Sequence, residues 1–133
     1  SIDLKPDAPL LPINLAHALI ETNDKANLDE AIDQLKHAVV AEKDNTMAWR
    51  LLAQAYASQG KEGEARLASA EYHFAAGQEQ QATLCALRAR SLLDPGSIEW
   101  RRAVDIVLAS GATQDDLSDL DRREALRRPA TLN

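Results

Sequence analysis

The chain has 133 residues, of which 45% are hydrophobic and 27% charged, a balance that argues against a disordered chain and is sufficient for one globular domain. Aromatic residues make up 4% of the chain, whereas Ala and Leu are abundant, so the composition favours helices over a β-sheet. The formal net charge of −6 argues against nucleic acid as a partner, because an acidic chain repels phosphate groups.

Helix-breaking residues divide the chain into a series of predicted helices joined by short links. The predicted helices span residues 10–22, 28–42, 46–59, 61–76, 78–93, 97–110 and 114–128. The links fall at residues 23–27 and 43–45, at Gly60, at Gly77, and at residues 94–96 and 111–113. Apolar residues of the second helix recur at i, i+3, i+4 and i+7, so this helix is predicted to bury one face. The sequence therefore predicts an all-α array of helical hairpins.

The spacing of particular residues indicates an internal repeat. Ala31 and Ala65 are 34 residues apart, which is the period of a common helical-hairpin repeat. Trp49 and Trp100 are 51 residues apart, which is one and a half such periods. The offset of half a period means that the repeat changes its phase between the two tryptophans.

The segment that begins at Trp49 resembles the signature of the tetratricopeptide repeat (TPR) family. The matching residues are Trp49, Leu52, Ala53, Tyr56, Gly60 and Ala65. Trp49 and Tyr56 are expected to fill the spaces where Ala53 and Ala65 let neighbouring helices approach each other closely. The predicted fold is thus an α-α superhelix of TPR-like hairpins with about seven helices.

Because of the change in phase, the helix predicted at 61–76 is expected to belong to two hairpins. It would be the second helix of the Trp49 hairpin and the first helix of the hairpin that the 78–93 helix completes. Small residues stand where this second role requires them, at Ala70, Gly77 and Ala82, and Gly111 follows Trp100 at the distance at which Gly60 follows Trp49. The predicted organisation is an N-terminal extension over residues 1–9, a repeat array over 10–112, and a capping helix with a tail over 113–133.

The resemblance to TPR modules also implies a binding surface. In that family the second, fifth and ninth residues of each hairpin's first helix face a concave groove that binds a protein or peptide. The corresponding residues here are Ile13, His17, Met47, Arg50, Gln54, Ile98, Arg101 and Asp105. Arg50 and Arg101 would supply forked donors for a carboxylate or a peptide backbone. The alternative interpretation of each position is solvated surface.

Three stretches together are similar to a narrower group, the C-terminal TPR region of bacterial zinc metalloproteases related to the CAAX prenyl proteases. The stretches cover residues 49–56, 65–71 and 95–106. This resemblance implies a periplasmic protein in quality control of the outer membrane, whose upstream domain carries the signal peptide and the HExxH zinc site. The partners would be that protease domain or outer-membrane assembly proteins. The alternative is a TPR adaptor without any link to proteolysis, which we would expect in the cytoplasm.

The chain itself carries no recognisable catalytic or metal-binding motif. HExxH, a glycine-rich phosphate loop and a GxSxG nucleophile are all absent from the sequence, so we expect no catalytic residue and no cofactor. His17 and Glu21 have a spacing that suits two zinc ligands but lack a third.

Cys85 is expected to be a small buried residue rather than a nucleophile. No apolar run reaches the roughly 20 residues that span a bilayer, so no membrane insertion is expected. An unrecognised enzyme or small-ligand binder stays open as a third class of function.

Overall fold

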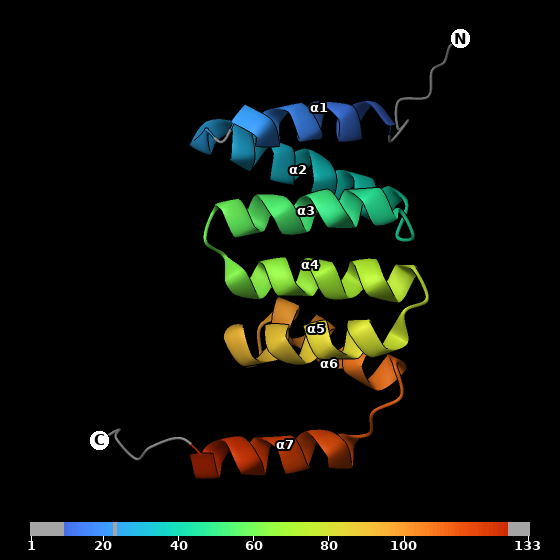
Figure 1. Ribbon diagram of the computed structural model, residues 1–133, viewed down its shortest axis with the longest axis vertical. Helices are drawn as coiled ribbons and strands as arrows, with labels where there is room; N and C mark the ends of the chain where they lie inside the picture. The colour runs from blue at the N-terminus through green and yellow to red at the C-terminus, as the bar shows by residue number, and fades with distance from the viewer. Residues whose placement is uncertain (1–9, 23, 128–133) are drawn as a thin grey trace.

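Residues 10–22 and 24–127 are described by a computed structural model, in which seven α-helices follow one another along the chain (Figure 1). The helices are α1 (Leu10–Thr22), α2 (Lys25–Ala41), α3 (Thr46–Ser58), α4 (Glu62–Ala75), α5 (Glu79–Leu92), α6 (Ile98–Ala109) and α7 (Gln114–Arg127). The described residues contain no strand, and the predicted all-α array of hairpins is confirmed. The predicted extension at 1–9 and the tail after residue 127 lie outside the described residues.

One predicted link is wrong. Residues 25–27 belong to α2 and not to a loop, because the Asp24 carbonyl accepts a hydrogen bond from the Leu28 amide at 2.8 Å and so closes the first turn of the helix. The Asn27 side chain donates to Thr22 Oγ1 at 2.8 Å, which joins this turn to the end of α1. An asparagine that signals a loop in the sequence therefore serves here to fix the angle between two helices.

The helix ends carry the caps that the sequence indicates. Asn45 accepts a hydrogen bond from the Ala48 amide at 3.1 Å at the start of α3, and Ser97 accepts one from the Trp100 amide at 3.1 Å at the start of α6. Gly60 and Gly77 follow α3 and α4 with φ of 77° and 79°, a left-handed conformation that favours glycine. Each link thus reverses the chain within a few residues.

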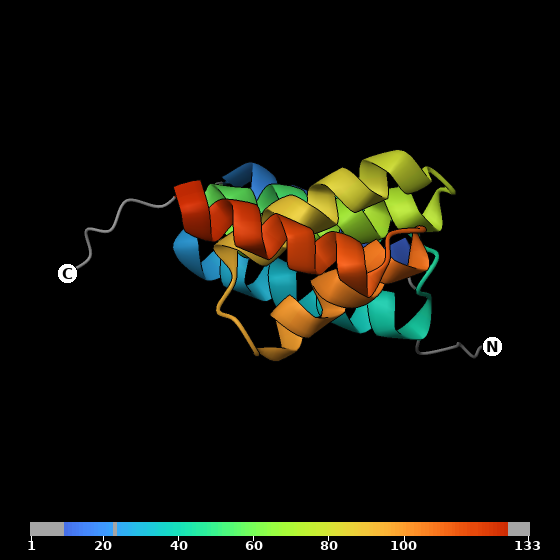
Figure 2. The ribbon, with the colours of Figure 1, turned by 90° about the horizontal axis from the view of Figure 1, so that it is seen from below.

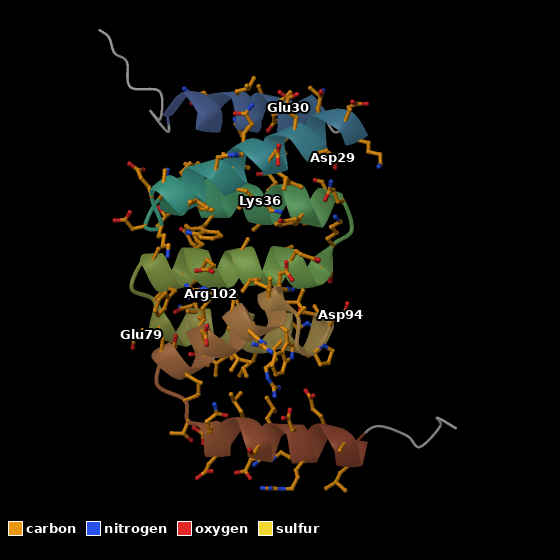
Figure 3. All side chains as sticks on the ribbon, turned by 180° about the vertical axis from the view of Figure 1, so that it is seen from behind. Asp29, Glu30, Lys36, Glu79, Asp94 and Arg102 are labelled. Carbon is orange, nitrogen blue, oxygen red and sulfur yellow. The ribbon has the colours of Figure 1, made fainter. Side chains whose placement is uncertain are left out.

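The helices form a row with two further helices on one side of it. In Figure 1, α1, α3, α4 and α5 follow one another from top to bottom, and the view from behind in Figure 3 shows α2 and α6 in front of this row. Figure 2, seen from below, also places α2 and α6 on the same side. α2 packs on α1 and α3, and α6 packs on α4 and α5. The junction of α3 and α4 lies between these two covering helices.

α4 packs against both of its neighbours in the row. It contacts α3 on one side and α5 on the other, and it also contacts α6. This is the double role that the half-period offset between the tryptophans predicts. At its start, α4 comes so close to the end of α5 that a Cβ added to Gly63 would lie 2.8 Å from Cδ2 of Leu93.

The core consists mainly of alanine and aliphatic residues in three clusters along the row. The small residues predicted to let helices approach are buried at Ala31, Ala65, Ala70 and Ala82. Trp49 and Tyr56 are half-buried against the first cluster, and Trp100 is half-buried against the third. Both tryptophans therefore contribute to packing, but each leaves part of its ring exposed.

α7 covers the end of the row through a small number of contacts. Leu117 is buried in the second cluster with Ile106 and Val107. The Arg90 guanidinium of α5 donates to both carboxylate oxygens of Asp121 at 2.8 Å and lies 5.4 Å from the centroid of the Trp100 ring. Arg90 is the more buried partner, with 9% of its side chain exposed against 57% for Asp121.

We predict that Asp121→Ala loosens α7 without affecting the remainder of the row. The change leaves the Arg90 guanidinium buried without its carboxylate, so amide hydrogen exchange in α7 should become faster, by roughly threefold to tenfold. Asp119→Ala is the matched control, because Asp119 is exposed and bonds to Arg122 of the same helix. Equal exchange in both variants would mean that Leu117 alone holds α7.

Candidate functional site

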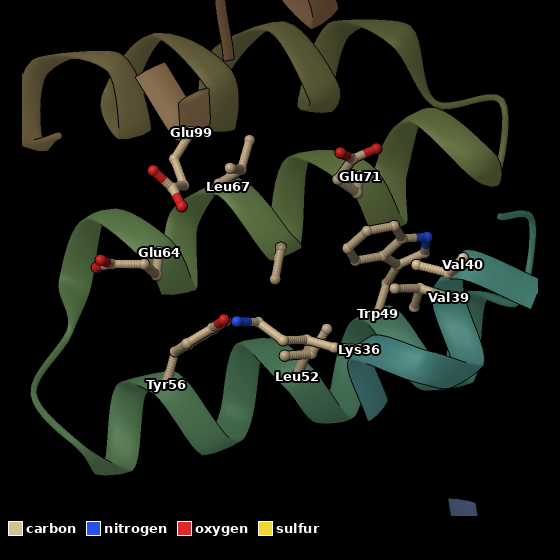
Figure 4. Close-up of a pocket in the computed structure, with 11 residues that line it drawn as sticks. Lys36, Val39, Val40, Trp49, Leu52, Tyr56, Glu64, Leu67, Glu71 and Glu99 are labelled. Carbon is tan, nitrogen blue, oxygen red and sulfur yellow. The ribbon is translucent and has the colours of Figure 1, made fainter. Parts of the chain in front are cut away.

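An apolar groove lies over the junction of α3 and α4. Its volume is about 300 Å³, its floor comes from α3 and α4, and its two walls come from α2 and α6 (Figure 4). The lining residues are Lys36, Val39 and Val40 of α2, Trp49, Leu52 and Tyr56 of α3, Glu64, Leu67, Ala68 and Glu71 of α4, and Glu99 of α6. Nearly all of the exposed lining is carbon, although four of the lining side chains are charged.

The floor exists because the large side chains of α3 recur on one side of the helix. Trp49, Leu52 and Tyr56 are spaced by three and four residues, and this spacing places them on one face. Leu67 and Ala68 of α4 complete the floor. The indole Nε1 of Trp49 donates to the Lys43 carbonyl at 2.8 Å, so the ring is held in one orientation with its polar atom satisfied.

The α2 wall of the groove ends in an exposed aliphatic side chain. Val40 is 77% exposed and lies beside Val39 and the Trp49 ring (Figure 4). An exposed valine next to a half-buried tryptophan enlarges the apolar surface beyond the groove itself. Surface of this kind is typical of the core of a protein–protein contact.

An ion pair connects the groove's floor to the helix that forms its far wall. The Arg102 Nε of α6 donates to Glu71 Oε2 at 2.6 Å, and its second donor reaches Oε1 at 2.8 Å. The hydrogen bond to Glu71 raises the pKa of Arg102 above its ordinary value, and burial lowers it to a smaller extent. Glu71 is 8% exposed, so the carboxylate depends on this arginine for compensation. The groove is consequently neutral at its Trp49 end.

We predict that Arg102→Met destabilises the fold by about 1–3 kcal/mol, since Glu71 would stay buried without its charged donor. The lower part of this range is expected because 43% of the Arg102 side chain is exposed and water screens part of the attraction. Urea unfolding measures the loss, and Arg101→Met is the matched control on the next residue, whose side chain is exposed. A similar loss in both variants would show that methionine itself, and not the broken pair, is responsible.

The opposite end of the groove is acidic. Figure 4 shows Glu64 and Glu99 at this end, above the Tyr56 hydroxyl. Burial raises the pKa of Tyr56, and the negative charges of Glu64 and Glu99 raise it further. No described residue forms an ion pair within 4.0 Å of either carboxylate. A second hollow of about 240 Å³ continues from this end; it shares Lys36 with the groove and is lined in addition by residues that include Asp29 and Lys61.

We predict that the double variant Glu64→Gln/Glu99→Gln lowers the pKa of Tyr56 but leaves it above its ordinary value, because the contribution of burial remains. The measurement is a spectroscopic phenolate titration in a Tyr72→Phe background, so that Tyr56 is the tyrosine observed. A titration unchanged by the double variant would show that these carboxylates do not act at the hydroxyl.

The raised pKa of Tyr56 also links its ionisation to stability. The folded state favours the neutral phenol, so this stabilisation is complete below the unfolded pKa of about 10 and is lost as the pH rises through the folded value. In the double variant the loss should begin at the same pH as in the parent protein, because the unfolded pKa is unchanged, but it should be smaller and be complete at a lower pH.

The residues predicted for a concave face do not line this groove. On α3, Met47, Arg50 and Gln54 are exposed but lie two residues before Trp49, Leu52 and Tyr56, which is about 200° around the helix axis. These three side chains therefore point to the side of the row away from the groove.

The corresponding residues of α6 point in another direction. Ile98, Arg101 and Asp105 are exposed on the face opposite Ala103 and Val107, which pack toward α4 and α5. Since α6 lies on the groove side of the row, the α3 and α6 sets face opposite sides of the molecule. His17 is exposed, with Nε2 3.4 Å from Glu21 Oε2, and the side chain of Ile13 lies outside the described part of the chain.

Cys85 offers little reactivity. Its thiol is half-buried beside the second core cluster, and burial raises its pKa, whereas the Arg66 charge lowers the pKa to a smaller extent. A thiol with a raised pKa is a poor nucleophile at neutral pH. Cys85, which was expected to be a small buried residue, is thus half-buried.

Within the described ranges, no group of three or more His, Cys, Asp or Glu side chains is arranged to hold a metal ion. None of the described helices combines the length and apolar character needed to cross a bilayer. Comparisons with protein-family models, with curated proteins and with solved structures found no match to this chain.

Proposed function

We propose that this chain is a non-catalytic protein-interaction module and that the groove between α2 and α6 binds a polypeptide. The observation that carries the proposal is an open apolar hollow floored by Trp49, Leu52 and Tyr56 and extended by the exposed Val40. Aromatic side chains that are half-buried in the free protein gain contacts at little entropic cost when a partner covers them. A row of helices also provides a rigid support for such a surface.

The resemblance to TPR modules supports the same class of function. On that resemblance we further propose that the chain is the C-terminal part of a bacterial periplasmic zinc protease and that its partner is the protease domain or an outer-membrane assembly protein. The alternative is a cytoplasmic TPR adaptor, which would use the groove in the same way. The full reading frame distinguishes these two, since an upstream signal peptide and HExxH motif belong to the first alone.

We predict that Val40→Glu weakens binding of an apolar peptide to the groove. The probe is an uncharged synthetic peptide of Leu, Ala and Gln, about five helical turns long, with Leu at i, i+3 and i+4. A carboxylate at position 40 would have to lose water on binding, so affinity measured by calorimetry should fall about tenfold or more.

Leu84→Glu is the matched control. Leu84 is 67% exposed on α5 and does not line the groove, so this variant has the same added charge and a comparable loss of exposed apolar surface elsewhere. It should bind the peptide as the parent protein does. Equal weakening by both changes would place the binding surface outside the groove, and circular dichroism of both variants checks that the helices are intact.

A further inference from the structure

The groove occupies a position that a helix would fill. α2 covers α1 and α3, and α6 covers α4 and α5, but none of the described helices covers the junction of α3 and α4. The tryptophans that mark the repeat are 51 residues apart, half a period more than one repeat, so the row continues across this junction while the covering layer does not. The vacant place lies between two helices of the same layer (Figure 3).

The described backbone favours a helix over an extended strand as the occupant. A strand gains affinity by adding to the edge of a sheet, and the described residues contain no strand and no sheet edge. A helix satisfies its own backbone hydrogen bonds and needs only an apolar surface on which to lay its side chains. The carbon-rich floor of the groove is a surface of that kind.

The charges at the two ends of the groove differ, and this difference selects the chemistry of the occupant. Near Trp49, the Glu71 carboxylate is compensated by Arg102 at 2.6 and 2.8 Å. Near Tyr56, the side chains that line the second hollow comprise three carboxylates, Asp29, Glu64 and Glu99, against the two ammonium groups of Lys36 and Lys61. The carboxylates of Glu64 and Glu99 are without an ion-pair partner among the described residues. A cation on the occupant would meet an excess of negative charge there.

We propose, on the basis of the polypeptide-binding function above, that the occupant is an amphipathic α-helix of a partner protein that lays apolar side chains on Trp49 and Leu67 and places a Lys or Arg beside Glu64 and Glu99. A second copy of this chain is a poorer occupant, because each copy carries a net charge of −6 and the two would repel. An acidic helix would meet unfavourable charges at the Tyr56 end.

The test compares three synthetic peptides that share the same Leu pattern. One carries Lys at two positions flanking the apolar face, the second carries Gln there and the third carries Glu. Binding is followed by the emission of Trp49 in a Trp100→Phe background and by calorimetry. The Lys peptide should bind about tenfold more tightly than the Gln peptide, the Glu peptide should bind more weakly than both, and circular dichroism should show the Lys peptide becoming helical on binding.

Two double variants show whether the carboxylates are responsible. Glu64→Gln/Glu99→Gln should remove the preference for the Lys peptide over the Gln peptide. Glu62→Gln/Glu79→Gln changes the net charge equally at exposed positions of α4 and α5 that do not line the groove, and should keep the preference. Loss of the preference in both variants would assign it to overall charge and overturn the proposed site.

The outcomes separate this inference from the proposed function. If the Gln peptide binds in a Val40-dependent manner and the Lys peptide binds no more tightly, the groove still binds polypeptide but the basic helix is wrong. If a Lys peptide with a central proline binds equally well, the occupant is extended rather than helical. If sedimentation shows a dimer that Val40→Glu dissociates, the occupant is a second copy. If none of the three peptides binds, both proposals fail.

Discussion

The architecture depends on the tight packing of α4 between α3 and α5. Small buried residues occur all along this helix, at Gly63, Ala65, Ala68 and Ala70, so that neighbours can approach it from different sides. α4 belongs to two hairpins at once, and no described helix covers its junction with α3. The close approach between Gly63 and Leu93 and the open groove over α3 and α4 are two results of the same arrangement. In a close-packed protein interior, one extra carbon at Gly63 would crowd Leu93 and destabilise the packing of α4 on α5.

The groove's polarity follows from which of its carboxylates has an arginine within reach. Glu71 is the most buried of them, and Arg102 donates to both of its carboxylate oxygens. This ion pair compensates the negative charge at the Trp49 end. Glu64 and Glu99 reach the rim from different helices and act together on Tyr56. The surface therefore combines an apolar floor with a charge at one end, and such a combination can fix the direction in which a partner lies as well as its affinity. Neither feature requires a catalytic group.

The helices and most of their ends could be predicted from the sequence, because caps such as Asn45 and Ser97 and the glycines after α3 and α4 act over a few residues. The double role of α4 could also be predicted, from the distance between Trp49 and Trp100. The groove could not. Its walls depend on how hairpins are oriented across the phase change, and the pair between Glu71 and Arg102 joins residues 31 positions apart. The concave-face prediction treated α3 and α6 as equivalent first helices of their hairpins, and it therefore placed together residues of α3 and α6 that face opposite sides. The signal that could have indicated the groove is the half-period offset itself, because it removes one covering helix.

The sparse attachment of α7 has a consequence for how the scaffold could be lengthened. The apolar end formed by Ile106 and Val107 is covered by Leu117, by the half-buried Leu120 and by one ion pair, so another helix with the same few groups could cover it. A hairpin grafted after residue 112, with a leucine at the place of Leu117 and a carboxylate within reach of Arg90, would meet the same surface. An open stack of this kind has no fixed number of units, in contrast to a closed barrel, so its length can be changed by adding or removing one hairpin.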